Sequence, residues 1–131
     1  AYWNADGTWS KPGVYSWRHL EDGIKHDAGK LRMDLIPPEA INALAEVLTY
    51  GVDKYGERNW ERGIQYSRIF AAVQRHLWAW WGGSGSDEES GIHHLHHALC
   101  GLAFLAAFNA RDKLELDDRP NSGARGSRNG E

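Results

Sequence analysis

Cysteine and methionine are almost absent from this 131-residue chain, which has one of each. A single cysteine, Cys100, excludes an internal disulfide, and it has no CxxC partner that would indicate a zinc site. Cys100 lies in the apolar segment LCGLAFLAAF, where a free cysteine packs as a small hydrophobic residue. We therefore expect a buried thiol with a packing role.

Long hydrophobic runs and an excess of one charge are also missing. The longest apolar runs are far shorter than the roughly 20 residues of a membrane span, and no charged-then-apolar leader opens the chain. The formal net charge is −3, with acidic and basic residues interspersed, which argues against a nucleic-acid partner or a membrane surface. We expect a cytoplasmic protein, and because the first residue is Ala1, a chain that is processed or cut from a longer one.

Three segments have the apolar spacing of helices. The first begins at Pro38, a residue suited to the first helical position, and ends at Gly56. The second is expected from an N-cap at Ser67 to Trp81, and the third from about 88 to 113, after the flexible break GGSGS. The third is apolar on both sides and should be the most buried. The sequence predicts an all-α bundle of three to four main helices, completed in a homodimer or homotetramer because its apolar faces are wide.

Composition divides the chain into three parts. Residues 1–24 mix Trp and Tyr with Gly, Pro and Asn and predict an irregular arm. Residues 25–113 form the single helical domain. Residues 114–131 have almost no apolar content and predict a polar, flexible tail.

The segment DEESGIHHLHHAL is the strongest candidate for a site. His94 and His97 are spaced i, i+3, so both imidazoles can reach one metal ion or one phosphate. Glu89 precedes them by more than a turn, and Asp87 falls at the expected helix N-terminus, where negative charge is favoured. The alternative is a capped helix with core and surface histidines, and His96 is expected at the surface.

The second helix adds His76 at the flank of its apolar face and Arg75 on a neighbouring stripe, a pair that suits an anion. The alternative is a structural ion pair to the first helix, where Glu39, Glu46 and Asp53 recur at heptad spacing. Such a stripe is typical of a solvated face. If it faces inward, Glu46 would supply a carboxylate for Mg²⁺.

Two further segments could bind parts of a nucleotide. The loop KHDAGKLR places cations around a glycine, which can hold a polyphosphate. The turn in GVDKYGERNW could stack on and hydrogen-bond a base, or it could simply pack its aromatic residues. The candidate substrate-binding residues are Lys25, Asp27, Lys30 and Arg32 in the loop, and Lys54, Tyr55, Asn59 and Trp60 around the turn.

Four segments together resemble a known family. They are KHDAGKLRMDLIPPEA, VLTYGVDKYGERNW, YSRIFAAVQRHLWAWW and DEESGIHHLHHALCGLAFL, in this order. The chain resembles the phage-type dATP/dGTP diphosphohydrolase (N-terminal domain) family over about residues 24–109. That family is grouped with the MazG-like all-α nucleoside triphosphate pyrophosphohydrolases.

The resemblance implies an enzyme that cleaves purine deoxynucleoside triphosphates to the monophosphate and pyrophosphate with Mg²⁺ or Mn²⁺. In a phage this activity would adjust the nucleotide pool of the host cytoplasm. MazG-like enzymes hold metal on an ExxE helix and an ExxD helix, but this chain has no ExxE, and HLHHAL stands where ExxD is expected.

Imidazoles at that position suit a softer ion such as Mn²⁺. The resemblance therefore implies a mixed site of His76, Glu89, His94 and His97. The alternative is that the histidines meet phosphate while Asp87, Glu89 and Glu46 hold the metal.

Two other functions stay open from the sequence. His/Asp-type triphosphohydrolases also use helical histidines, but the adjacent pair His26-Asp27 lies in a loop. The other reading is a non-catalytic nucleotide- or metal-binding helical bundle. Product analysis separates these, since the His/Asp class releases tripolyphosphate and a binding protein leaves the triphosphate intact.

Overall fold

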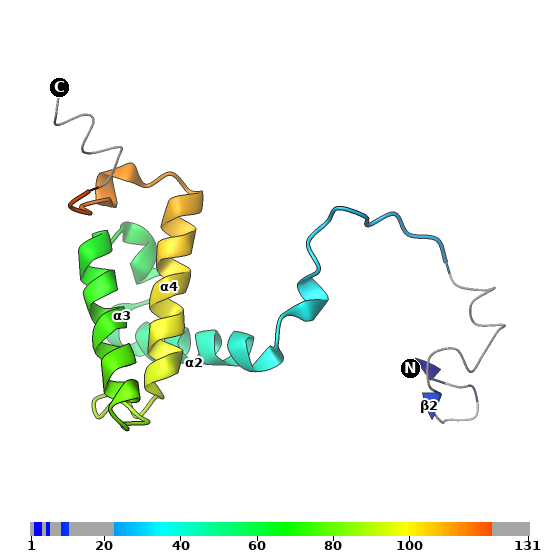
Figure 1. Ribbon diagram of the computed structural model, residues 1–131, viewed down its shortest axis with the longest axis horizontal. Coiled ribbons are helices and arrows are strands. Elements are labelled where there is room, and N and C mark those ends of the chain that lie inside the picture. The colour runs from blue at the N-terminus through cyan, green and yellow to red at the C-terminus, as the bar shows by residue number, and fades with distance from the viewer. Residues whose placement is uncertain (1, 4, 6–8, 11–22, 122–131) are drawn as a thin grey trace. The chain divides into compact units, whose positions relative to one another are not determined.

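The computed structural model describes residues 2–3, 5, 9–10 and 23–121 and divides the chain into two compact units, 1–33 and 34–131 (Figure 1). In the first unit, β1 (Tyr2–Trp3) pairs in antiparallel fashion with β2 (Trp9–Ser10). Most of the predicted aromatic arm lies outside the described residues. The boundary assigns residues 25–33 to the first unit, whereas the sequence predicts a helical domain from residue 25.

The second unit is helical, which confirms the predicted all-α class. Helices α3 and α4 pack side by side, and α2 packs against α4 (Figure 1). Pro38 occupies the first turn of α2 and Gly56 follows its last residue, as predicted. The elements are η1 (Met33–Leu35), α2 (Pro38–Tyr55), η2 (Asn59–Arg62), α3 (Tyr66–Trp81), α4 (His94–Ala110) and η3 (Leu114–Leu116).

The hydrophobic core lies between α3 and α4. Its buried members are Ile69 and Val73 of α3 and Ala98 and Phe108 of α4. Because α4 contacts both other long helices, it is the central element that its two apolar sides predict. One of those sides is nevertheless partly open, since Leu95 and Leu102 are 36% and 51% exposed.

Two predicted helix starts are wrong. Helix α3 begins at Tyr66 with Gln65 as its N-cap, and Ser67 instead bonds through its backbone N–H and hydroxyl to Asp118. Helix α4 begins at His94 rather than near residue 88, and it ends at Ala110. The reason is Gly91, whose positive φ of 74° interrupts a right-handed helix.

The first part of the expected flexible tail is folded. Asp117 is 2% exposed, and its carboxylate accepts hydrogen bonds from Arg119 Nε and Nη2 at 2.9 and 2.8 Å. Asp118 accepts the hydrogen bonds from Ser67 on α3. The polar composition of this segment therefore reflects side-chain anchoring, and the folded unit extends at least to residue 121. Residues 122–131 of the predicted tail lie outside the described residues.

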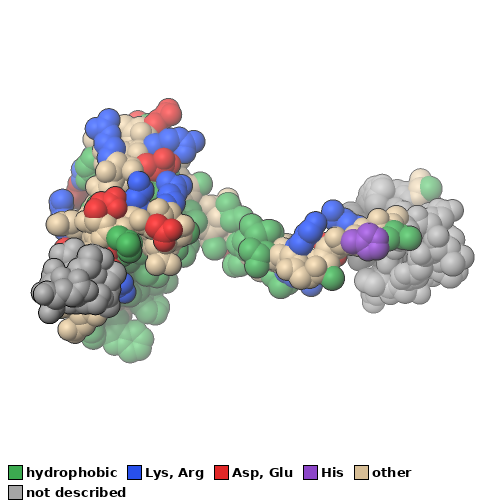
Figure 2. Space-filling view, turned by 90° about the horizontal axis from the view of Figure 1, so that it is seen from above, with side chains coloured by type: hydrophobic (Ala, Val, Ile, Leu, Met, Phe, Trp, Pro, Cys, Tyr) green, Lys and Arg blue, Asp and Glu red, His purple; other side chains and the backbone are tan. Residues whose placement is uncertain are grey.

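Apolar side chains remain exposed on the helical unit. On the face seen in Figure 2, Lys and Arg side chains are intermingled with Asp and Glu, and hydrophobic side chains gather along the lower edge. The exposed set includes Ile41, Leu48, Val52 and Tyr55 of α2 and Phe70, Trp78 and Trp81 of α3. Such exposure favours association, and the homo-oligomer stays a prediction. Within the described part of the chain, no helix is both long and apolar enough to cross a membrane.

Candidate metal and phosphate site

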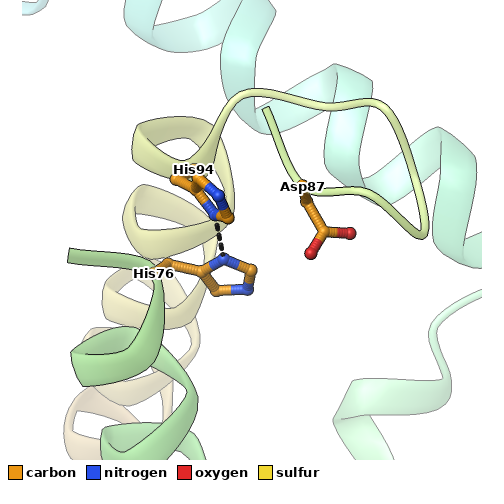
Figure 3. Close-up of side chains that lie close together, drawn as sticks. All are labelled: His76, Asp87 and His94. Atoms are coloured by element: carbon orange, nitrogen blue, oxygen red, sulfur yellow. Dashed lines mark hydrogen bonds between the residues drawn. The ribbon is translucent and has the colours of Figure 1, made fainter. Parts of the chain in front are cut away.

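Three side chains from three different segments converge at the start of α4. His76 comes from α3, Asp87 from the connecting loop, and His94 from the first position of α4 (Figure 3). One ligand atom from each lies within 4.8 Å of the others, and His76 Nδ1 is 2.9 Å from His94 Nδ1. His94 is 7% exposed and His76 is partly buried, so the nitrogen pair has one buried and one partly open member beside a carboxylate.

The turn after α3 brings the loop back onto the cluster. Gly83 has a φ of 105°, which lets the next residue, Ser84, donate its N–H to the carbonyl of Ala79 at 3.0 Å. The N–H of His94 then donates to the carbonyl of Gly85 at 2.9 Å. The segment expected to be a flexible break is thus hydrogen-bonded to both helices that carry the histidines.

Ser90 links Asp87 to His97. Asp87 Oδ2 accepts from the N–H of Ser90 at 2.9 Å and from its hydroxyl at 3.0 Å. Because that hydroxyl gives its only proton to the carboxylate, the 2.7 Å contact with His97 requires Nε2–H of His97 to donate to Ser90 Oγ. A neutral His97 therefore carries its free lone pair on Nδ1.

Burial and hydrogen bonding shift the pKa values of His76, Asp87 and His97 in the directions that suit a bound cation. Burial and the neighbouring histidines His97 and His94 lower the pKa of His76, and burial also lowers the pKa of His97. Burial alone would raise the pKa of Asp87, but the two hydrogen bonds from Ser90 together with the nearby His97 and His76 lower it below its ordinary value. The site thus combines a carboxylate that favours the ionised form with two imidazoles, His76 and His97, that favour the neutral form.

A cleft of about 770 Å³ extends from this cluster along α2. It brings together residues that the sequence proposed separately for metal, phosphate and base. Its cations are Lys54, Arg58 and Arg68. Among the predicted site residues, those lining it are Lys54, Tyr55, Asn59, Trp60, His76, Asp87, Glu89 and His97.

The remaining predicted residues lie elsewhere. Arg75 is exposed on α3 and does not line the cleft, where Arg68 supplies the arginine of that helix. Glu46 faces His96, with Oε1 2.8 Å from Nδ1, and so joins α2 to α4 beside the cleft. His94 is buried and is not among the residues that line the cleft.

Lys54 and Trp60 line the cleft but have protein partners. Lys54 forms an ion pair with Glu89. Trp60 stacks on Phe104 at 4.8 Å between ring centroids, which supports the packing alternative for that residue. The four loop residues Lys25, Asp27, Lys30 and Arg32 belong to the first unit and stay predictions from the sequence.

Sequence reasoning missed the two serines that contact the histidines. Ser84 Oγ lies 3.0 Å from His94 Nε2, and Ser90 Oγ contacts His97. Both were hidden in segments that the sequence assigned to a flexible break and to a helix. One sequence feature could have indicated them. Serines and glycines occur shortly before the histidine run, and this composition is typical of an ordered turn as well as of a flexible linker.

The cluster passes a simple test for a divalent ion. Two nitrogens that are each about 2.0–2.1 Å from one ion lie about 2.9–3.4 Å apart at ligand angles of about 90–110°. The observed separation of His76 Nδ1 and His94 Nδ1 is 2.9 Å, within this range, so both can reach one ion once the proton that they share in this hydrogen bond has left Nδ1. Two imidazoles and a carboxylate form a donor set that suits Mn²⁺ or another transition ion better than Mg²⁺.

A small helical bundle in which a histidine–carboxylate cluster opens into a cation-bearing cleft defines a domain suited to a metal ion and a phosphate-containing ligand. The family model described as dATP/dGTP diphosphohydrolase, N-terminal, matches residues 20–119, and the chain belongs to this family. The resemblance drawn from the sequence is thereby confirmed, and the MazG-like relationship stays a prediction.

A relative named dATP/dGTP diphosphohydrolase from Salmonella phage PMBT28 is 41% identical over 83 residues. The match covers 63% of this chain and 28% of the relative, so it spans less than a third of that protein's length. No solved structure matches the chain.

Proposed function

We propose that the helical unit hydrolyses purine deoxynucleoside triphosphates to the monophosphate and pyrophosphate, with a divalent ion at His76, Asp87 and His94. One observation carries the proposal: the cleft joins the candidate metal cluster to Lys54, Tyr55 and Asn59 along α2. The name of the phage relative supports the substrate class. In a phage, this reaction would remove purine nucleotides from the pool available for replication.

Different residues of the cleft are suited to different parts of the nucleotide. Lys54, Arg58 and Arg68 attract the phosphates, because their positive charges offset the negative charge of a triphosphate in the cleft. Tyr55 offers an aromatic face, and Asn59 offers an amide for the base. When bound, the ion supplies positive charge where negative charge develops during hydrolysis.

His97 is suited to accept the proton of the attacking water. It lines the cleft, burial lowers its pKa, and Ser90 leaves the Nδ1 lone pair available. The water oxygen bonds to the α phosphorus, the bond from that phosphorus to the oxygen bridging the α and β phosphates breaks, and pyrophosphate leaves with that oxygen. The water proton goes to Nδ1 of His97.

The test uses the four deoxynucleoside triphosphates with chelator-stripped protein and added Mg²⁺ or Mn²⁺. Products are resolved by ion exchange for the wild type, Asp87→Asn and the control Asp112→Asn. Asp112 is exposed with a φ of 54°, a conformation that asparagine adopts readily. We expect monophosphate and pyrophosphate from purines in the wild type and control, and a loss of about 100-fold or more in Asp87→Asn.

Two results would contradict this proposal. Release of tripolyphosphate would assign the His/Asp-type reaction instead. Intact triphosphate in every reaction, together with measurable nucleotide binding, would assign a non-catalytic binding domain.

A further inference from the structure

Ser84 occupies a position that the proposed reaction does not use. It follows Gly83 in the turn after α3, and its hydroxyl contacts two groups: the carbonyl of Ser86 at 3.4 Å and His94 Nε2 at 3.0 Å. Its backbone N–H is held by the carbonyl of Ala79. The hydroxyl is therefore fixed against the side of the His94 ring that is remote from His76.

The hydrogen-bond roles at Ser84 follow from what each partner can do. A carbonyl oxygen only accepts, so the 3.4 Å contact with Ser86 is a hydrogen bond only when Ser84 Oγ donates it, and this is the arrangement on which the inference rests. The lone pair of Ser84 Oγ then accepts from Nε2–H of His94. In the neutral ring this leaves Nδ1 of His94 without a proton, and it is this atom that faces Nδ1 of His76.

We propose that Ser84 is a positioning residue that holds His94 in the Nε2–H tautomer and so makes its Nδ1 a ligand for a transition ion such as Mn²⁺ in preference to Mg²⁺. This inference rests on the proposed function for the identity of the site, and it deepens that function by naming the ligand atom and the class of ion. Metal-binding histidines usually donate their second ring N–H to a fixed acceptor, and removal of such an acceptor weakens metal binding about 10- to 100-fold.

Three features of this site agree with that role. The Nδ1 atoms of His94 and His76 are 2.9 Å apart, within reach of one ion. Asp87 adds a carboxylate within 4.8 Å. His94 is buried, so if its proton were on Nδ1, the ring could not easily turn to expose that N–H to water.

The experiment measures metal binding directly and does not depend on turnover. Calorimetric titrations with Mn²⁺ and with Mg²⁺ are compared on the chelator-stripped full chain for the wild type, Ser84→Ala, Ser84→Thr and Ser67→Ala. Ser67 is the matched control because its hydroxyl bonds to Asp118, which is not part of the cluster. Long-range ¹H–¹⁵N spectra of the histidines report the tautomer of His94 in the metal-free protein.

We expect the wild type and Ser67→Ala to bind Mn²⁺ equally, and Mg²⁺ at least about 10-fold more weakly. Ser84→Ala should weaken Mn²⁺ binding about 10- to 100-fold without loss of helical circular dichroism, and Ser84→Thr should restore it because it keeps the hydroxyl. The spectra should show a proton on Nε2 of His94.

The inference is overturned if Ser84→Ala binds Mn²⁺ as tightly as the wild type, if His94 carries its proton on Nδ1, or if Mg²⁺ binds as tightly as Mn²⁺. Its failure is distinguishable from failure of the proposed function. A protein that binds Mn²⁺ through Ser84-dependent His94 but cleaves no nucleotide contradicts only the proposed reaction. A protein that cleaves nucleotide with unchanged binding in Ser84→Ala contradicts only this inference.

Discussion

Gly101 on α4 lies directly against Val73 on α3, so closely that a Cβ atom at Gly101 would be 2.5 Å from Val73 Cγ2. No ordinary contact is this short, and the same Cβ would be 3.5 Å from Ile69 Cγ2. The two core helices therefore approach each other at a position where only glycine fits. His76 follows Val73 by about one turn of α3, so the close approach lies next to the candidate site.

Replacement of this glycine should destabilise the fold. We expect Gly101→Ala to lower the free energy of unfolding by about 1–3 kcal/mol, because the added methyl group overpacks a filled core. The matched control is Gly51→Ala in α2, where an added Cβ would meet nothing within 4 Å. That change should stabilise the protein by about 0.5–1 kcal/mol through helix propensity. Urea unfolding of both variants measures the difference, and equal shifts would contradict the close approach.

Much of the fold was predictable from local patterns. The bounds of α2 follow from Pro38 and Gly56, and the central place of α4 follows from apolar residues on both its sides. The start of α4 was not predictable, because most residues of DEESGIHHLHH are compatible with a helix and the local sequence does not show that the segment before His94 is a turn. The conformation of Gly91 and the pairing of Ser86 with His93 depend on contacts with the rest of the fold.

The candidate site was predictable in its residue types and less so in its partners. His76, Asp87 and His94 were each named from the sequence, but only the folded chain shows that these three converge. The expectation for Arg75 depended on the angular position of a helix stripe. Arg68 lies on the same side of α3 two turns earlier, so the position along the helix, which the stripe does not give, decides that Arg68 lines the cleft instead.

Cys100 should be unreactive in the native protein. The residue is 2% exposed, and burial raises the pKa of its thiol to about 11, so the reactive thiolate is scarce at pH 8. We expect negligible labelling by Ellman's reagent at pH 8 and one equivalent in urea. Because the chain has one cysteine, the denatured sample is its own control. Rapid labelling of the native protein would show that the thiol is open to solvent.

The metal-free protein should lose stability in mild acid. The pKa values of His76 and His97 are lowered in the folded state, whereas an unfolded histidine titrates near about 6.5. Below that value the unfolded chain binds protons that the folded chain resists, so the free energy of unfolding should fall as pH decreases from about 7 toward about 5. The stability that these two histidines contribute is fully present above the pKa of an unfolded histidine. Urea midpoints across this range measure the effect.

A double variant tests whether these two histidines cause the loss. His76→Gln combined with His97→Gln should show a shallower decrease over the same pH range, although its stability at pH 7.5 will also be lower. An unchanged slope would assign the pH dependence to other groups. The lowered pKa of Asp87 acts in a separate window, because its contribution is lost only as pH falls below the unfolded carboxyl value of about 4.

Lys54 and Glu89 should have opposite effects on nucleotide binding. Their side chains form an ion pair in the cleft, and the hydrogen bond with Glu89 raises the pKa of Lys54. A triphosphate that uses Lys54 must compete with this carboxylate. We therefore expect Lys54→Met to weaken binding of a non-hydrolysable α,β-methylene dATP about 10-fold, and Glu89→Gln to strengthen it a few-fold, at low salt. If the pair serves only to join α2 to the loop, both changes should weaken binding alike, and fluorescence or calorimetric titration of the two variants decides between these roles.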